Sequence, residues 1–303
     1  MKLFPHTRRR YLEALTDHVV VFDGAMGTSV QQCNLGPIDF GGEHLNGCND
    51  YLVISQPEVI EQIHASFLAV GCEAIETDTF RSNRITMREY QLQDRIVEIN
   101  RTAAALARRV ADRFERETGV PRFVAGSIGP SGMLPSTNDP TLSNITFQEL
   151  VDVFREQCLG LIEGGADLLL IETQQDILET KAAVHGAWRA FEETGKRIPL
   201  QTQITLDTSG RMLLGTDIAA ALTTLEALPV VDVIGLNCST GPDYMREPVR
   251  YLTTHSRKPI SVIPNAGLPL NVDGQAVYPM KPVPLAETLA EFVTQLGVDV
   301  VGG

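Results

Sequence analysis

The sequence predicts an α/β fold of the (β/α)8 TIM-type barrel, and three observations lead to that prediction. Eight short runs rich in Val, Ile and Leu recur along the 303 residues, each followed by a turn and then a helical pattern. Continuous apolar strands bounded by turns are typical of a buried parallel sheet. The length suits one such barrel, whose usual size is about 250 residues. No linker, fixed-period repeat or charge block divides the runs, so we expect a single domain over residues 1–303.

The predicted strands share a β-branched composition and a turn at their carboxyl end. They cover residues 19–22, 74–77, 123–125, 168–171, 200–206, 231–236, 260–263 and 298–301. The eighth run stops just before Gly303, so we expect these residues to lack the helix that follows the last strand of a complete barrel.

Apolar residues at helical spacing fill the segments between strands. One stripe begins after Pro57, a residue suited to a first helical turn. The stripes are Val59, Ile60, Ile63, Phe67 and Val70; Ile96, Ile99, Ala103, Leu106, Val110 and Phe114; and Leu150, Phe154, Cys158 and Leu161. An open nucleotide-binding sheet would need a G-x-G-x-x-G fingerprint after its first strand. Residues 23–28 are glycine-rich but lack that spacing, which favours the barrel.

Composition excludes several classes of function. The net charge of −13 argues against a nucleic-acid partner, because an acidic surface repels phosphates. No apolar run reaches the roughly 18 residues of a membrane span, and residues 1–10 do not resemble a secretory signal. Five cysteines, an odd number spread widely, argue against a disulfide framework and favour a cytoplasmic protein.

The carboxyl ends of the predicted strands are rich in polar residues, and in a barrel the active site lies at those ends. Acidic residues there suit recognition of an amino group or general base work. The alternative is that they cap helices or pair with Arg81 and Arg84. The turn at 126–132 could direct backbone N–H groups at a carboxylate or phosphate, or simply be a tight turn. The acidic candidates are Asp23, Glu76, Asp78 and Glu172.

Cys238 differs from the other cysteines because it follows Asn237 at the end of a predicted strand. It could be a nucleophile or a metal ligand. A nucleophile needs an activating base, and no histidine occupies a strand end. One thiolate does not bind zinc tightly by itself. From the residues alone, Cys238 is an incomplete site.

Six motifs in order give the sequence a specific resemblance. The motifs are Asp-Gly-Ala-Met-Gly-Thr at 23–28, Ile-Glu-Thr-Asp-Thr-Phe at 75–80, Gly-Pro-Ser-Gly at 129–132, Ile-Glu-Thr at 171–173, Gly-Leu-Asn-Cys at 235–238 and Pro-Asn-Ala-Gly at 264–267. From about Tyr11 to Gly303 the chain resembles the homocysteine S-methyltransferase family. Within it, the chain looks most like the N-terminal homocysteine-binding module of the cobalamin-dependent methionine synthases.

The resemblance implies roles for individual residues. In this family three cysteines hold a zinc ion. The resemblance implies that Cys238 is one of these ligands and that the other two cysteines would follow Gly303. Asp23, Gly24 and Glu172 would hold the amino end of homocysteine, and backbone around Ser127 and Ser131 would meet its carboxylate. Asn265 would lie near the metal. Thr79 and Asn237 would form part of the wall.

The expected activity is zinc-dependent transfer of a methyl group to the thiol of homocysteine, giving methionine. Methylcobalamin and folate would be carried by separate modules of the same or a partner chain, because no Asp-x-His-x-x-Gly cobalamin motif occurs here. Three alternatives stay open: a homocysteine-binding module without its own catalysis, a methyltransferase that uses betaine or S-methylmethionine, and a zinc-free barrel enzyme that uses its carboxylates as acid and base.

Overall fold

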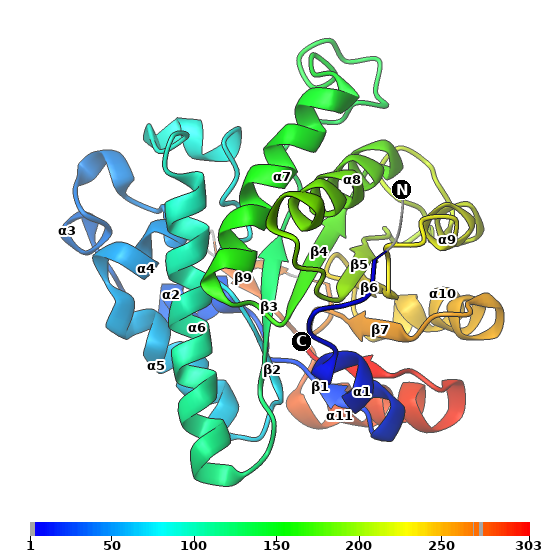
Figure 1. Cartoon of the computed structure of the whole chain (residues 1–303). Helices are drawn as coiled ribbons and strands as arrows, with labels where there is room; N and C mark the ends of the chain where they lie inside the picture. Colours follow the sequence, from blue (N-terminus) through cyan, green and yellow to red (C-terminus); the bar gives the residue numbers. More distant parts are fainter. Residues whose placement is uncertain (1–3, 269, 273–274) are drawn as a thin grey trace.

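Eight parallel strands form a barrel in the computed structural model, which describes residues 4–268, 270–272 and 275–303 (Figure 1). The strands run in the order β1-β10-β7-β6-β5-β4-β3-β2 around the sheet. Between β1 and β2, Phe22 bridges Ala74, and the Asp23 N–H donates to the Ala74 carbonyl at 2.9 Å. The predicted fold class is therefore confirmed. The barrel strands are β1 (Val20–Val21), β2 (Ala74–Glu76), β3 (Phe123–Ile128), β4 (Leu168–Gln174), β5 (Leu200–Ile204), β6 (Val233–Asn237), β7 (Ile260–Ile263) and β10 (Val300–Val301).

Helices cover the outside of the barrel and carry the apolar stripes read from the sequence, except that Val70 lies just past the helix that ends at Ala69 and is 85% exposed. Thr146 and Glu149 form a capping box at the start of α7, and the Asp176 side chain caps α8. Gly160 lets α7 lie close against α6, because a Cβ there would fall 2.6 Å from the Val97 carbonyl oxygen. The main outer helices are α5 (Pro57–Ala69), α6 (Ile96–Thr118), α7 (Phe147–Gly164), α8 (Ile177–Thr194), α9 (Ile218–Glu226), α10 (Pro242–His255) and α11 (Pro282–Glu291).

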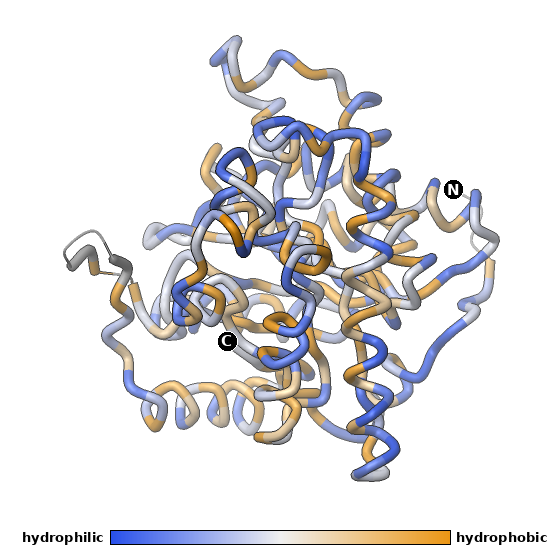
Figure 2. The backbone as a smooth tube through the Cα atoms, turned by 90° about the vertical axis from the view of Figure 1, so that its left-hand side faces the viewer, coloured by the Kyte–Doolittle hydropathy of each residue, from blue (hydrophilic) through white to orange (hydrophobic). Residues whose placement is uncertain are grey.

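Shorter elements occupy the connections. They are α1 (Arg10–Asp17), α2 (Met26–Gln32), α3 (Pro37–Phe40), α4 (Leu52–Ser55), the 3-10 turns η1 (Glu43–Leu45), η2 (Asn49–Tyr51) and η3 (Thr86–Tyr90), the π-turn η4 (Phe292–Leu296) and the hairpin β8 (Leu270–Val272) with β9 (Gln275–Val277). In Figure 2 many of the hydrophobic stretches lie within the body of the protein. None of the helices among the described residues has the length and apolar character needed to cross a membrane.

An acidic residue directly precedes every second barrel strand, at the face opposite the strands' carboxyl ends. Three of these carboxylates accept a backbone N–H from the neighbouring strand: Asp167 from Val124 at 2.9 Å, Asp232 from Leu200 at 2.9 Å and Asp299 from Ile260 at 2.7 Å. The fourth is Glu73, before β2. These bonds tie adjacent strands together at the base of the barrel.

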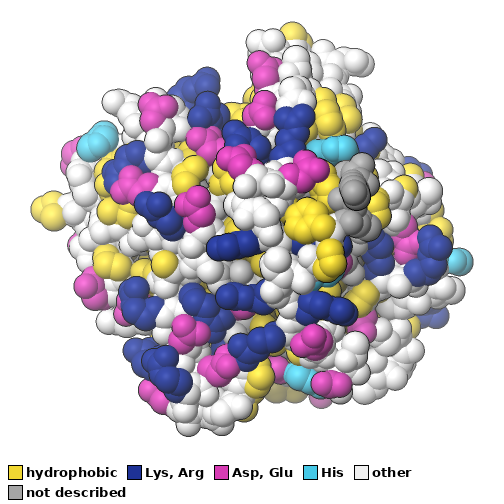
Figure 3. All heavy atoms as spheres, in the orientation of Figure 1, with side chains coloured by type: hydrophobic (Ala, Val, Ile, Leu, Met, Phe, Trp, Pro, Cys, Tyr) yellow, Lys and Arg dark blue, Asp and Glu magenta, His cyan; other side chains and the backbone are white. Residues whose placement is uncertain are grey.

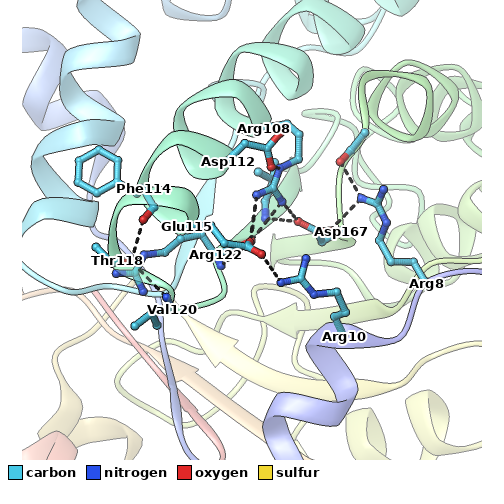
Figure 4. Close-up of polar contacts among 12 residues, drawn as sticks. Arg8, Arg10, Arg108, Asp112, Phe114, Glu115, Thr118, Val120, Arg122 and Asp167 are labelled. Carbon is cyan, nitrogen blue, oxygen red and sulfur yellow. Dashed lines mark hydrogen bonds and ion pairs between the residues drawn. The ribbon is translucent and has the colours of Figure 1, made fainter.

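The N-terminal segment crosses this base and pairs with three of the four acids. His6 lies 3.0 Å from Asp232, Arg8 2.9 Å from Asp167, and His18 2.7 Å from Glu73. Figure 4 shows Arg8 and Arg108 meeting Asp167, with Arg10 reaching Glu115 beside them. Figure 3 shows Lys and Arg side chains spread over this side, with Asp and Glu between them.

Tyr11 closes the base of the barrel from inside. Its side chain is 1% exposed, packs edge-on against Phe22 and Phe123, and donates its hydroxyl to Gln201 Oε1 on β5 at 2.5 Å. Burial, and then the nearby charge of Asp299, raise the pKa of this phenol. The N-terminal segment is therefore part of the barrel core.

Replacing Tyr11 by Phe keeps the ring and leaves a buried acceptor of Gln201 without its donor. We expect the free energy of unfolding to fall by about 1–3 kcal/mol, measured by urea denaturation. Tyr244→Phe is the matched control, because Tyr244 is half-exposed and its change should stay within about 0.5 kcal/mol. Equal effects of the two variants would contradict the assignment of Tyr11 as a core hydrogen-bond donor.

Candidate active site

A cavity of about 480 Å3 opens at the carboxyl ends of the barrel strands. A volume of this size is typical of sites for small molecules. The barrel contributes residues from the ends of six of its strands and from the segment after β10. These lining residues are Asp23, Gly24, Glu76, Asp78, Ser127, Glu172, Asn237, Cys238, Ile263, Asn265 and Gly303.

Three carboxyl groups share the inner end of this cavity. Burial raises the pKa of Asp23, Glu76 and Glu172, and the charge of Glu172 raises the pKa of the other two further. For Glu172 the pKa rises to about 7. None of the three forms an ion pair with a described Lys or Arg; Arg84 pairs with Glu156 and Arg81 with Glu89 instead. Such a group of buried carboxyls would be stabilised by a cation.

Hydrogen bonds fix the orientation of Glu172. Ser127 donates its hydroxyl to Oε1 at 2.5 Å, and Asn237 donates Nδ2 to Oε2 at 2.9 Å. Asn237 is held in turn, because its Oδ1 accepts the backbone N–H of Thr173 at 2.7 Å. Asp23 is fixed similarly, since both of its oxygens lie 3.1 Å from the Glu76 N–H. The carboxyls are therefore preorganised.

The backbone is strained where β4 and β6 reach the cavity. Thr173, Cys238 and Ser239 have φ angles of 55°, 57° and 61°, a region that residues other than glycine seldom adopt. Two hydrogen bonds hold Cys238 there: its N–H donates to the Ile263 carbonyl at 3.0 Å, and its carbonyl accepts the Thr240 N–H at 2.7 Å. Strain of this kind clusters at functional sites, which supports a special role for Cys238.

The Cys238 thiol is weakly acidic in this environment. Burial, and then the charge of Glu172, raise its pKa to about 11, so the thiol keeps its proton at neutral pH. No described histidine lines the cavity. No three described His, Cys, Asp or Glu side chains are arranged to hold a metal ion. The described residues therefore do not by themselves fit zinc, and Cys238 offers one ligand.

Ser127 and Ser131 occupy different places. Ser127 lines the cavity, and its backbone N–H donates to Thr77 Oγ1 at 3.0 Å. Ser131 lies outside the lining residues, and its N–H donates to Glu179 Oε1 of α8 at 2.7 Å. The backbone N–H groups expected to meet a substrate carboxylate are thus engaged within the protein, and that role stays a prediction.

The cavity extends beyond the barrel strands into a region that we call the outer chamber. It is lined by Cys48, Asp50, Asp78, Met87 and Tyr90, from the connection between β1 and β2, the end of β2, and η3. Of these, only Asp78 lies at a strand end. A search of strand ends therefore misses the others; the one signal was the polar stretch at 48–51.

The comparison with known families gives a clear result. The family model described as homocysteine S-methyltransferase matches residues 20–303. The chain belongs to the homocysteine S-methyltransferase family. The resemblance inferred from the six motifs is thereby confirmed.

Curated relatives of the chain include two methionine synthases. That of Mycobacterium tuberculosis (strain ATCC 25618 / H37Rv) is 45% identical over 295 residues, and that of Mycobacterium leprae (strain TN) is 44% identical over 292 residues. Each match covers 96% of this chain and 24% of the relative. The chain thus spans about a quarter of the length of these members of the family.

Solved structures support the fold of this family member. The homocysteine methyltransferase MmuM from Escherichia coli, in its oxidized and metallated forms, matches with a TM-score of 0.76 at 20% identity. The match covers 96% of this chain and 94% of that one.

The structure brings together most of the residues predicted for the site. Asp23, Gly24, Ser127, Glu172, Asn237, Cys238 and Asn265 all line one cavity. Glu76, weighed among the acidic strand ends but not assigned a role, lies with them. Thr79 is buried behind the wall and donates its hydroxyl to the Ser127 carbonyl at 2.7 Å.

The buried carboxyl of Glu179, outside the cavity, makes the stability of the protein depend on pH. Burial raises its pKa from 4.5 to about 7, so between these values the folded state binds a proton that the unfolded state has lost. Stability must then fall as pH rises through that window. We expect the free energy of unfolding of Glu179→Gln, taken relative to that of the wild type, to be higher at about pH 7 than at about pH 5. Urea denaturation at the two pH values measures this difference. Glu192→Gln, on the exposed side of α8, should show a constant difference; the same constant difference for Glu179→Gln would rule out this titration.

Proposed function

We propose that this chain binds homocysteine in the inner end of the cavity and presents its thiol to a methyl donor, as the homocysteine-binding module of a methionine synthase. The observation that carries the proposal is the group of three buried carboxyls without a paired cation. The ammonium group of an amino acid supplies the missing positive charge. Membership of the homocysteine S-methyltransferase family, and the similarity to methionine synthases, support homocysteine as that amino acid.

The proposed roles follow from the positions of the residues. Asp23 and Glu172 bind the ammonium group, together with Gly24 as the family resemblance implies. Asn237 and Ser127 act as positioning residues, because they hold the Glu172 carboxylate. Binding of the substrate carboxylate by backbone at Ser127 and Ser131 would require those N–H groups to exchange their present partners.

We also propose a zinc ion whose ligands include residues beyond those described. Cys238 supplies one thiolate, and two further cysteines would directly follow Gly303, with Asn265 nearby. Gly303 lines the same cavity as Cys238, so residues that follow it would begin at the site. When bound, zinc stabilises thiolates at neutral pH. Homocysteine binding without catalysis by residues 1–303 alone is the second candidate, favoured by the incomplete set of metal ligands among the described residues.

The methyl donor belongs to the same proposal. Methylcobalamin and a folate-binding barrel would lie on separate modules of the same or a partner chain, consistent with relatives about four times longer. A cytoplasmic location is also proposed, supported by five free cysteines; nucleic acid and membranes are not proposed as partners.

Asp23→Asn tests the ammonium site. The variant keeps the shape and one acceptor for the Glu76 N–H but removes a charge, and we expect homocysteine to bind about ten- to a hundredfold more weakly, the loss of a charged hydrogen bond. Calorimetric titration with homocysteine measures this. Asp243→Asn, on the exposed side of α10, is the control. An unchanged dissociation constant for Asp23→Asn would refute the ammonium role.

Cys238→Ser tests the metal ligand. In protein that retains whatever residues follow Gly303, we expect bound zinc to fall from about one equivalent per chain to near zero, because a hydroxyl replaces a thiolate ligand. Metal analysis after dialysis measures it, and Cys33→Ser, at an exposed cysteine, should keep its zinc. Full zinc occupancy in Cys238→Ser would remove Cys238 from the site.

A further inference from the structure

The Asp78 carboxyl is buried without a hydrogen-bond partner. The residue is 6% exposed, its Oδ2 is inaccessible, and neither oxygen accepts a hydrogen bond from a described residue. A buried polar group in this state is costly unless a ligand completes it. Asp78 lines the cavity and only its Oδ2 is inaccessible, so a ligand in the cavity would meet the carboxyl at Oδ1.

The local chain places Asp78 on the cavity side. Thr77 and Thr79 turn toward β3: Thr77 Oγ1 accepts the Ser127 N–H, and Thr79 donates to the Ser127 carbonyl. Glu76, Thr77 and Asp78 all line the cavity, whereas Thr79 is buried behind its wall. The strand ends at Glu76, and the Thr79 N–H donates to the Thr77 carbonyl at 2.8 Å, which closes a tight turn with Asp78 at its centre. The turn presents the Asp78 carboxyl to the cavity beyond the end of the strand.

Asp50 adds a second carboxyl to this chamber. One of its oxygens accepts the Arg81 N–H at 2.9 Å, and burial raises its pKa to about 6. Burial and the charge of Asp50 also raise the pKa of Asp78. The Arg81 guanidinium lies 3.4 Å from Glu89 and forms no ion pair with either aspartate. The outer chamber therefore offers acceptors and negative charge.

Homocysteine does not account for this second acidic region. Its single ammonium group is matched by the carboxyls at the inner end, and a small amino acid fills only part of a cavity of about 480 Å3. A methyl donor has to approach the homocysteine thiol through the same cavity. The outer chamber is part of that cavity.

We propose that Asp50 and Asp78 form a subsite for the methyl donor, in which they accept hydrogen bonds from an N–H-bearing group of that donor. This inference rests on the proposed homocysteine methyltransferase function. An ammonium group and a carboxamide share the required chemistry. S-methylmethionine carries the first, and methylcobalamin carries several of the second; betaine has no N–H.

The test compares the wild type with Asp78→Asn, in protein that retains any residues following Gly303. Calorimetry in saturating homocysteine measures binding of methylcobalamin, S-methylmethionine and betaine. We expect the dissociation constant of one N–H-bearing donor to rise about tenfold, as for a lost charged hydrogen bond, with betaine unaffected. The donor that responds identifies the source of the N–H group. Homocysteine affinity should stay within about twofold, and Asp94→Asn, at an exposed carboxylate, should match the wild type.

The outcomes separate the two proposals. Wild-type protein that binds neither N–H donor, or an Asp78→Asn variant that binds both as the wild type does, overturns the donor subsite. An equal loss of homocysteine affinity also overturns it, because Asp78 would then belong to the amino-acid site. Wild-type protein that binds a donor but transfers no methyl group contradicts the methyltransferase function and leaves the subsite standing. Should Asp78→Asn not fold, Asp50→Asn provides the same comparison.

Discussion

The carboxyl groups of Asp23, Glu76 and Glu172 are buried together, without a paired cation among the described residues, at the carboxyl ends of the strands, the mouth of the barrel. The arrangement of the other residues at the mouth depends on these three groups. Mutual repulsion and loss of water both penalise their charged forms. Asn237, Ser127 and the Glu76 N–H bind the carboxyl oxygens and keep the groups in place. These contacts orient the carboxyl groups but bring no positive charge to them. The mouth is consequently a site whose electrostatics are completed by what it binds.

The two ends of the barrel treat acidic residues in opposite ways. At the base, Asp167 and Asp232 accept strand N–H groups and also pair with Arg8 and His6. At the mouth, Asp23 and Glu172 have hydrogen bonds but no basic partner among the described residues. Residues of the same chemical type therefore stabilise the fold at one end and remain available for a ligand at the other.

Much of this could be predicted from the sequence, because strand composition and strand-end position carry the information. All eight predicted runs overlap barrel strands, and Asp23, Glu172 and Cys238 were found by their position after such runs. Position after a strand does not show which way a loop turns: the Ser131 N–H donates to Glu179, and the role toward the substrate that the family resemblance implies for Ser131 stays a prediction. Asp50 lies in the long connection between β1 and β2 and was not predicted, because the path of that connection depends on tertiary packing that no local pattern encodes.

The bonds at the base have a consequence for how such a barrel can diverge. Asp167, Asp232 and Asp299 each tie the strand that follows them to its neighbour, at the end of the barrel remote from the cavity. Loops around the cavity can then lengthen, shorten or change their side chains, because the hydrogen bonds at the base of the barrel hold the strands in register. Substitutions in those loops should therefore change what the cavity binds more readily than they change the stability of the core.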